Sequence, residues 1–525
     1  MGAVITAAAS FVEGTVALAA AFAAAAVLVL SDPRSRALTM PVALGLALGA
    51  VALISGSTIS DEVSARGSLV AAAGAAGVVL LLALAVLFVR RPGWFALGVM
   101  FTLPFRIPVP TGSDDSANLL LPLYVVIGAG VLAHVWRALR GQEGDAVGED
   151  PRARRVMQAL AVVVVLYALQ ALYSSDLEHA VKTLGFFYVP FAVCMRLLVE
   201  LRWSRRLVMQ ALGVTVGLAL LFAAVGFAEW ATGRLLISNE KVLAANDLKP
   251  YFRVNSLFFD PNVYGRFLAL VMVVLAGVLL WAPARRDVAR VAVGLAVLWA
   301  ALVLTLSESS FAALLVGLAA LAALRWRAWP VLAVCGAGVA VGLVLVLASP
   351  GALGLKTDSF SAINEASSGR AKLIRGGLEM AADRPITGYG SGSFADRYRE
   401  RERVMSSRIS AESHTIPVTI AAEQGLVGIA AYGFLLVSAF ALVFGGLRGA
   451  LRRRSAGVVL VARCVVAAAF CALLVHTFVY AAFLEDPLTW TLLAIAAALR
   501  RVEPEADLAG DHRAVAEGAA QPVPT

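Results

Sequence analysis

Residues 69–89 read LVAAAGAAGVVLLLALAVLFV, an apolar run without a charge, and Arg90-Arg91 follow it directly. A helix needs roughly 20 mainly apolar residues to cross the hydrocarbon core of a bilayer, so this run can span one. Similar runs recur along the chain, from 14–30 to 488–499. By this length criterion we count about fourteen runs and predict an all-α, polytopic transmembrane helix bundle of about 12–15 spans.

The composition supports the same fold class. Hydrophobic residues make up 60% of the 525 residues, and the mean hydropathy is +0.82. A water-soluble domain cannot bury that much apolar sequence. All four cysteines fall inside apolar runs, where thiols behave as small hydrophobes, so we expect no disulfide or metal framework.

The weakest apolar run is 94–105, which is short and contains Pro104 near its end. It predicts either a tilted span or a re-entrant segment.

Arginine clusters occupy alternate loops and indicate the orientation, because short cytoplasmic loops are enriched in basic residues. The intervening loops carry acidic residues, such as Asp61-Glu62 and Glu485-Asp486, and are predicted to face outward. Basic anchors on one side of the membrane account for the net charge of +9, so we expect no nucleic-acid partner. The predicted cytoplasmic clusters are 90–91, 137–155, 202–206, 285–290, 325–327 and 448–454.

Five parts of the chain follow from this pattern. Two outward segments, 231–259 and 349–413, are too long and polar to be simple connections, and long loops often carry function. The predicted parts are N-terminal transmembrane helices (1–204), central transmembrane helices that include the outer loop 231–259 (205–348), a large extracytoplasmic loop (349–413), C-terminal transmembrane helices (414–502) and a disordered cytoplasmic tail (503–525).

The lysines add positive charge to the outward regions. This distribution indicates an anionic ligand, although lysines that only solvate the loops would give the same pattern. The lysines are Lys182, Lys241, Lys249, Lys356 and Lys372.

Residues 371–382, in the second long segment, predict a short amphipathic helix that ends at Asp383-Arg384-Pro385. Its apolar face is expected to hold Leu373, Ile374, Leu378 and Ala381. Arg370 stands at its start, where unpaired backbone N–H groups and a guanidinium together suit a phosphate. The alternative is an interfacial helix whose arginine extends to lipid headgroups.

A glycine-dense stretch follows, GYGSGSF at 388–394. No strand precedes it in a βαβ unit, so we interpret it as a turn that needs positive φ or close backbone approach, and not as a nucleotide site.

Among the histidines, His414 stands where the second long segment enters the next apolar run. It shares the two long segments with Arg253 and Arg370. The other histidines are less suggestive, since His134 and His512 fall on the predicted inner side, His179 lies in a short loop and His476 lies on an apolar helix.

Three stretches share the two long segments and their borders: residues 253–265 read RVNSLFFDPNVYG; SGR at 368–370 leads to DRPITGYGSGSF at 383–394; and 413–428 read SHTIPVTIAAEQGLVG. These stretches resemble signatures of the O-antigen ligase/polymerase superfamily. The resemblance covers roughly 207–447. In two places the chain departs from the family's frequent pattern, with Ser309-Ser310-Phe311 in place of Ser-Arg-Gly and Thr415 in place of Asn after the histidine.

The resemblance implies a GT-C-like membrane glycosyltransferase in the inner or plasma membrane, with its site on the extracytoplasmic side. Such enzymes move a glycan from undecaprenyl diphosphate to a hydroxyl of an acceptor glycan or a lipid-linked acceptor. Arg253 and Arg370 would bind the diphosphate, and His414 would accept the hydroxyl proton or orient the hydroxyl. We expect no cofactor and no metal. The supporting residues would be Asp260, Asn262, Arg266, Lys372, Arg384, Tyr389 and Glu423.

Three alternatives remain open. A lipid-linked glycan flippase or another polytopic transporter fits the helix count, but it normally places ionisable groups near mid-membrane, and the apolar runs here hold few charges. A peptidoglycan polymerase would carry other motifs. A non-catalytic scaffold would leave Arg253, Arg370 and His414 unexplained.

Overall fold

The computed structural model describes residues 2–110, 116–142, 150–237, 242–243, 246, 251–281, 285–326, 328–348, 359–361, 364, 367, 369–403, 413, 415–453, 457–480 and 482–502. His414, Ser368 and the predicted tail 503–525 therefore lie outside the described residues.

Twelve helices of the described chain are long and apolar enough to cross a membrane, which agrees with the predicted 12–15 spans and confirms the fold class. One of these spans is continuous through α7 (Leu177–Thr183), the π-helix η1 (Leu184–Tyr188) and α8 (Val189–Glu200). The other eleven are α1 (Gly2–Val29), α2 (Pro33–Ile54), α3 (Gly56–Arg90), α5 (Leu121–Leu139), α6 (Pro151–Ala171), α9 (Arg205–Thr232), α11 (Pro261–Trp281), α12 (Arg285–Thr305), α13 (Glu308–Arg325), α18 (Ile416–Phe444) and α20 (Val458–Val479). A further helix, α14 (Ala328–Ala348), follows α13. A final helix occupies 487–502, and α19 (Leu447–Arg453) links α18 to α20.

The weak apolar run is a short helix, α4 (Gly93–Thr102), of 10 residues. At 1.5 Å per residue it reaches about 15 Å, half of a hydrocarbon core, which fits a re-entrant segment better than a full span. The chain continues into an antiparallel hairpin of β1 (Ile107–Pro110) and β2 (Ser116–Leu119). This hairpin is a small addition to the predicted all-α bundle, and the two prolines in β1 make its sequence resemble a loop.

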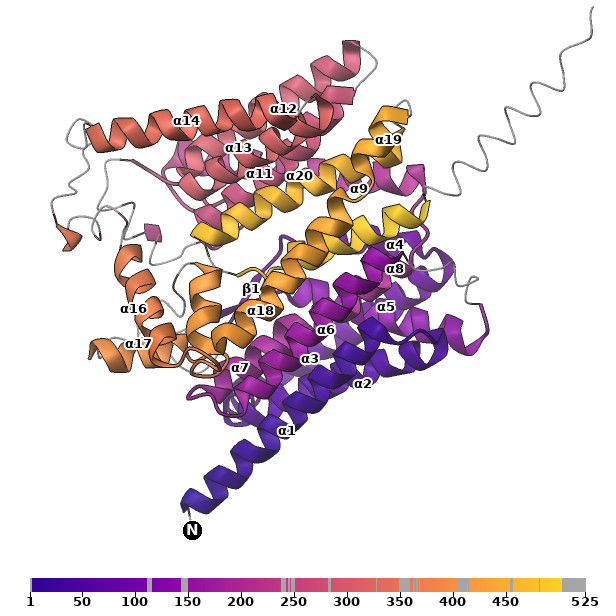
Figure 1. Cartoon of the computed structure of the whole chain (residues 1–525). Coiled ribbons are helices and arrows are strands. Elements are labelled where there is room, and N and C mark those ends of the chain that lie inside the picture. The colour runs from indigo at the N-terminus through magenta and orange to yellow at the C-terminus, as the bar shows by residue number, and fades with distance from the viewer. Residues whose placement is uncertain are drawn as a thin grey trace, which may run out of the picture.

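The helices form two packed groups that meet at α20. In Figure 1, α20 runs between the group of α11 to α14 and the group that holds α1 to α6 and α18. One face of α20, with Cys464 and Phe470, belongs to the larger core of the N-terminal helices, α18 and 487–502. Another face, with Ala468 and Ala472, belongs to the core of α9, α11, α12 and α13. The polar end of α20 is therefore next to both groups.

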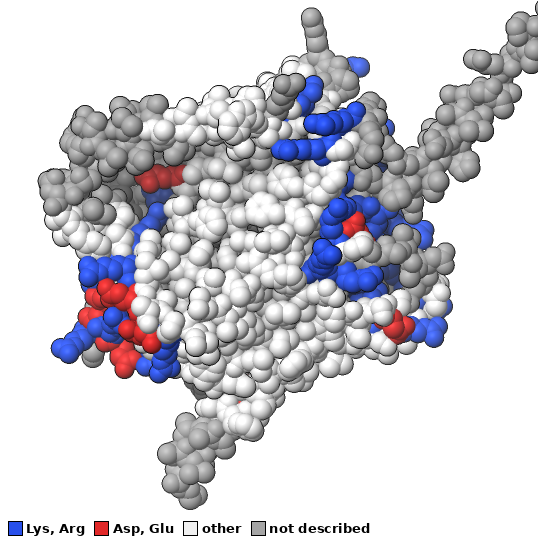
Figure 2. Space-filling view, in the orientation of Figure 1, with Lys and Arg blue, Asp and Glu red and all other residues white. Residues whose placement is uncertain are grey.

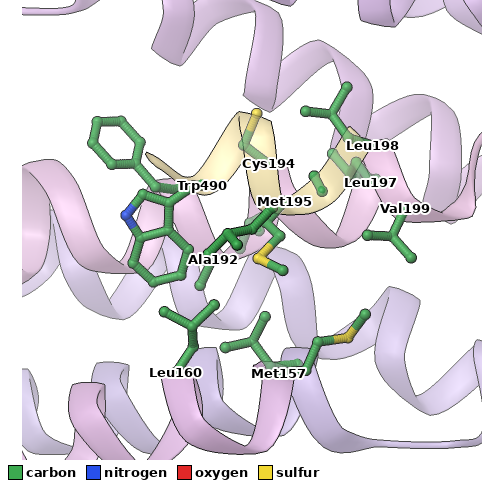
Figure 3. Close-up of a cluster of buried hydrophobic side chains, with 14 of the residues drawn as sticks. Met157, Leu160, Ala192, Cys194, Met195, Leu197, Leu198, Val199 and Trp490 are labelled. Atoms are coloured by element: carbon green, nitrogen blue, oxygen red, sulfur yellow. The ribbon is translucent and has the colours of Figure 1, made fainter. Parts of the chain in front are cut away.

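The larger core is tightly filled where α6, α8 and the final helix meet. Figure 3 shows Met157 and Leu160 of α6 beside Met195 of α8 and Trp490 of the final helix. Each of these side chains is buried. Trp490 also donates its indole N–H to the carbonyl of Leu484 at 2.8 Å, so the loop before the final helix is fixed in place. This loop carries Glu485 and Asp486.

On the face that Figure 2 shows, charged side chains lie on two opposite rims. One rim, over α12 and α19, is mainly basic. The other rim carries both charges and lies over α16 (Arg370–Asp383) and α17 (Phe394–Glu402), and a broad band free of charge separates the two. A multi-pass membrane protein is expected to show this distribution, because charges are costly in the hydrocarbon core. Buried charges within the spanning helices, such as Glu229, Arg266 and Glu423, lie near the helix ends.

A buried ionic cluster joins three N-terminal helices. The Glu200 carboxylate of α8 lies 2.5 Å from Arg36 Nε of α2, 3.0 Å from Arg196 Nε and 3.1 Å from His134 Nε2 of α5. The cluster explains why charged residues are tolerated at the ends of these apolar helices, since each is paired.

The predicted amphipathic helix is present as α16 (Arg370–Asp383). Its buried face differs from the prediction, because Leu378 is 54% exposed whereas Gly376, Gly377 and Met380 are buried. The two glycines explain the difference, since Tyr398 and Phe394 lie so close that a Cβ at either glycine would clash. These aromatic residues belong to α17 (Phe394–Glu402), which packs on α16 and α18.

Candidate functional site

The first long segment is fixed by one buried carboxylate. Glu229, in the last turn of α9, accepts hydrogen bonds from the backbone N–H groups of Leu236 at 2.8 Å, Asn255 at 3.1 Å and Ser256 at 2.7 Å. Ser256 has φ +53°, a backbone conformation that is costly for a residue with a side chain. The carboxylate therefore holds a strained turn directly after Arg253.

The second long segment is fixed in the same way. Glu423 of α18 accepts from the N–H groups of Gly392 at 2.9 Å and Phe394 at 3.0 Å. The contact occurs beside a kink in α18, where Gly425 has φ +62°. Glu423 thus connects the glycine-dense turn to a spanning helix.

The glycine-dense turn is a packing element, as the sequence predicts. Gly388 and Gly390 have φ of +67° and +101°, and a Cβ at either would overlap the backbone of Glu423 or Ser174. The turn therefore fits between α18 and the end of α6 only with glycine at these positions.

We expect Glu423→Gln to loosen the glycine-dense turn, and Glu229→Gln to loosen the turn after Arg253. The amide NH₂ of glutamine would face backbone N–H groups that need an acceptor, and each unsatisfied buried group costs about 1–3 kcal/mol. The thermal unfolding midpoint should fall, and hydrogen exchange should accelerate in 388–394 or in 253–258 respectively. Glu178→Gln, at an exposed position of α7, is the matched control. Wild-type exchange rates in both turns would contradict this role.

Arg253 lies against the end of α12. Its Nε donates to the carbonyl of Thr305, the last residue of α12, at 2.9 Å, and Nη2 reaches Asn262 Oδ1 at 3.4 Å. Carbonyls at a helix C-terminus lack helical partners and carry partial negative charge, so they hold a guanidinium well. No partner for Nη1 is found among the described residues, which leaves N–H groups available to a ligand.

A string of polar side chains extends from Asn262 to a buried histidine. Ser307 Oγ donates to Asn262 Oδ1 at 2.9 Å and lies 3.2 Å from Ser309 Oγ. Ser309 Oγ in turn lies 3.2 Å from Nε2 of His476, which is fully buried. Arg253 and His476 are thus joined through α11 and α13. Ser309, which stands where the family often has another pattern, is part of this string.

The start of α11 adds a second polar contact. Asp260 accepts from the N–H of Asn262 at 2.6 Å through Oδ1, as an N-cap does, and from the hydroxyl of Tyr480 at 2.8 Å through Oδ2. Burial raises the pKa of Tyr480, so its hydroxyl stays a donor. Farther into α11, Arg266 forms an ion pair with Asp486. These contacts therefore join the polar start of α11 to the residues at the end of α20.

Arg370 reaches the same region from the large loop. It is the first residue of α16, is half-buried, and its side chain makes no hydrogen bond or ion pair within the described parts of the chain. Its charge acts on the His476 ring, as does the charge of Arg266. Arg266 and Arg370 therefore lie within electrostatic reach of His476, and the polar string from Asn262 links Arg253 to the same ring. We call this set, with Asn262, Ser307, Ser309 and His476, the arginine site.

The side chains of three predicted supporting residues, Lys372, Arg384 and Tyr389, contact other residues of the large loop. Lys372 pairs with Glu402 at 2.6 Å, and the Arg384 guanidinium lies 4.6 Å from the centre of the Tyr389 ring. The hydrogen bond to Glu402 is the main cause that raises the pKa of Lys372, which stays charged. These contacts favour a role in ordering the loop.

A cavity of about 60 Å³ lies beside the glycine-dense turn. His179, Glu423, Tyr432 and Glu485 are among the residues that line it. Burial raises the pKa of the Glu485 carboxyl, and the charges of His179 and Arg106 oppose that rise. A water needs about 10–15 Å³ of such volume, so the cavity suits a few waters and not a sugar.

Several residues of the site have little signal in the sequence. His476 and Ser309 occur in apolar helices, and only the packing of α13 against α20 joins them. Glu229 and Glu423 do have a signal, since a carboxylate within an apolar helix is rare and usually has a dedicated partner.

In the part of the chain that the structure describes, no group of three or more His, Cys, Asp or Glu residues could hold a metal ion.

A comparison with protein families finds a match to the O-antigen ligase family over residues 293–433. The chain carries an O-antigen ligase domain. The predicted resemblance to the O-antigen ligase/polymerase superfamily is thereby confirmed over these residues. The O-antigen ligase domain contains α16, the glycine-dense turn and Glu423, while Arg253 and His476 flank it in the sequence. No curated protein matches the chain. The family supports a glycosyltransferase-like enzyme in a multi-pass membrane protein.

Proposed function

We propose that this protein transfers a glycan from undecaprenyl diphosphate to an acceptor hydroxyl at the extracytoplasmic face of the plasma membrane. The charges of Arg266 and Arg370 act on His476, and a string of hydrogen bonds links Arg253 to the same ring. This arrangement, in a chain with an O-antigen ligase domain, supports the proposal. The mixed-charge rim would face outward, because the opposite rim is basic and basic loops stay in the cytoplasm.

The reaction replaces one bond at the anomeric carbon with another. The acceptor oxygen attacks that carbon, the bond to the phosphoryl oxygen breaks, and undecaprenyl diphosphate leaves with the electron pair. Negative charge on the leaving group grows in the transition state, where the free N–H groups of Arg253 and Arg370 stabilise it. His414 accepts the proton of the hydroxyl. Arginines replace a metal ion in this scheme, so none is required.

The position of the buried charges is the specific reason to prefer transfer over transport. Buried charges of the spanning helices lie near helix ends, whereas a transporter site normally lies near mid-membrane. A flippase of lipid-linked glycans is the remaining candidate, since it would also bind a diphosphate.

The test is a reconstituted transfer assay. Protein in nanodiscs receives an undecaprenyl-diphosphate-linked glycan and a candidate acceptor, and the product is resolved by gel and mass spectrometry. Transfer should persist in EDTA, because arginines neutralise the diphosphate. Activity that is lost on chelation and restored by a divalent ion would contradict this mechanism. Movement of the lipid-linked glycan between leaflets without transfer would favour the flippase.

Gene deletion separates the two transferase types. A polymerase mutant should carry surface glycans of one repeat, whereas a ligase mutant should leave full chains on the lipid carrier. Unaltered surface glycans would contradict both.

A further inference from the structure

The large loop presents an apolar patch at the break in α18. Ile386 is 65% exposed, Leu426 is 63% exposed and Val427 is 41% exposed. They lie together, because the N–H groups of Leu426 and Val427 donate to the carbonyls of Pro385 at 2.8 Å and Ile386 at 3.3 Å. We call Ile386, Leu426 and Val427 the loop patch. Single exposed apolar side chains are common, whereas a contiguous set usually has a partner.

The loop patch continues an exposed apolar stripe along α18. The residues that follow Leu426 on the same face are exposed as well: Ala430, Phe434, Val437 and Ala441. On a helix that spans a membrane, such a stripe faces lipid. Ile386 belongs to the large loop, but it therefore extends the lipid-facing surface of a spanning helix.

The level of the opposite membrane boundary is marked by Arg500. Its Nε donates to Asp150, directly before α6, at 2.8 Å, and its Nη1 donates to the carbonyl of Gly445, directly after α18, at 2.5 Å. The basic clusters 137–155 and 448–454 flank these two residues. Basic clusters stand at the edge of the hydrocarbon core, so α6 and α18 leave that edge at one level.

Helix length then gives the depth of the loop patch. In Figure 1, α16 and α17 lie beside the end of α18 that is opposite α19. Residues 426–444 of α18 extend about 27 Å, and the 21 residues of α6 extend about 31 Å. A hydrocarbon core is about 30 Å thick, and a tilt of either helix only lowers these heights. The loop patch therefore lies just inside the core.

Polar groups border the loop patch where the core ends. Arg384, directly before Pro385, is exposed and makes no ion pair within the described residues. Its charge acts on Tyr173, which follows α6 and is 45% exposed. Arginine and tyrosine are both typical of the interface between lipid and water, because each has an apolar body and a polar tip.

The carbonyls of residues 385–387 all have donors, as a position inside hydrocarbon requires. The first two accept from α18, and that of Thr387 accepts from the Tyr173 hydroxyl at 2.8 Å and from Gln170 Nε2 at 3.3 Å. Gln170 also donates to the carbonyl of Gln424, beside the break in α18, at 3.2 Å. Irregular backbone is tolerated at membrane depth only where protein groups satisfy it.

We propose that residues 385–387 insert into the leaflet beside α16, where acyl chains of the bulk phospholipid cover the loop patch. Arg384 then meets the phosphates of the same lipids. Insertion fixes the large loop to the membrane at the point where it crosses α18. The proposal goes beyond glycan transfer, since neither donor nor acceptor takes part in it.

The test measures the surroundings of position 386 in the full-length protein, in nanodiscs of phosphatidylethanolamine and phosphatidylglycerol. Ile386→Cys receives a nitroxide spin label after Cys335 and Cys471, the cysteines that are not buried, are replaced by alanine. The label should collide more often with oxygen, which concentrates in lipid, than with a water-soluble nickel chelate. A label at Val437→Cys should behave in the same way.

A label at Arg375→Cys is the aqueous control, because this side chain on α16 is 64% exposed and charged. It should collide more often with the nickel chelate. The same preference at position 386 would place the loop patch in water. A label at 386 that meets neither reagent would place the patch against protein, such as a second copy of the chain. Either result would overturn the proposal.

A charge at position 386 gives a second measurement that needs no label. Ile386→Glu should accelerate hydrogen exchange in residues 386–390 at least roughly tenfold, because a carboxylate is costly inside hydrocarbon. Ile386→Val should exchange at the wild-type rate. Leu378→Glu is the matched control, since Leu378 is 54% exposed but lies on α16 outside the loop patch, and it should leave these rates unchanged. Wild-type rates in Ile386→Glu would again overturn the insertion.

Discussion

Replacing Arg253 or Arg370 by lysine should slow glycan transfer by roughly 10²–10³-fold, the usual cost of losing one preorganised donor to a developing negative charge. The substitution keeps the positive charge but removes the planar fork that can hold two phosphoryl oxygens. At position 253 it also removes the Nε that donates to the Thr305 carbonyl, so the ammonium would lack its fixed orientation. The measurement is single-turnover transfer with donor affinity determined in parallel.

Arg375→Lys is the matched control. Arg375 lies on α16 with Arg370, but its side chain is 64% exposed and pairs with Glu379 at 2.9 Å. Exposed ion pairs contribute little, so this variant should transfer at the wild-type rate. If Arg253→Lys and Arg370→Lys also transfer the glycan at the wild-type rate, positive charge alone suffices, and the bidentate role of the two guanidinium groups is wrong.

Replacing His414 by alanine should slow transfer by roughly 10²–10⁴-fold, the usual contribution of a positioned acid–base group. Donor affinity should stay close to wild type, because the arginines and not the histidine would hold the diphosphate. Binding and turnover should therefore separate in this variant, whereas they should fall together in an Arg370 variant that loses donor contacts. Donor titration followed by single-turnover kinetics in nanodiscs measures both quantities.

Two comparisons make the His414 result interpretable. His512→Ala, in the predicted tail, should leave both quantities unchanged. His476→Ala removes the ring that ends the Asn262 to Ser309 string, so it should weaken donor binding through Arg253 as well as slow transfer. Loss of donor binding in His414→Ala as complete as in the arginine variants would make His414 a phosphate ligand and not a base.

The sequence was sufficient to predict the fold class because the signals are local. The length and hydropathy of an apolar run, such as 69–89, are enough to show that it can span a membrane. Basic clusters such as 448–454 mark the ends of such runs. The amphipathic helix after Arg370 is also a local signal, and α16 begins and ends within a residue of the predicted range. Its buried face could not be predicted in full, since Tyr398 and Phe394 pack against Gly376 and Gly377, while Leu378 is exposed.

Part of the candidate site was likewise accessible from the sequence. The family-like stretches contain Arg253, Asp260, Asn262, Arg370 and Glu423, and the glycine-dense turn is recognisable as a packing element. The hydrogen-bond and ion-pair partners of these residues could not be predicted, because a single sequence does not show which helix ends lie next to each other in the fold.

The sequence by itself thus determined a polytopic helical membrane protein with an O-antigen ligase domain and the residue types of a phosphate site. Only the tertiary structure decided that α11, α13 and α20 meet at their polar ends, where His476 joins Ser309 and Arg266 pairs with Asp486. It also brought Arg106, from the N-terminal half, to the same place. The physical reason is that hydropathy and helix length are summed over neighbouring residues, whereas a buried polar site depends on side chains far apart in the chain satisfying one another where water is excluded.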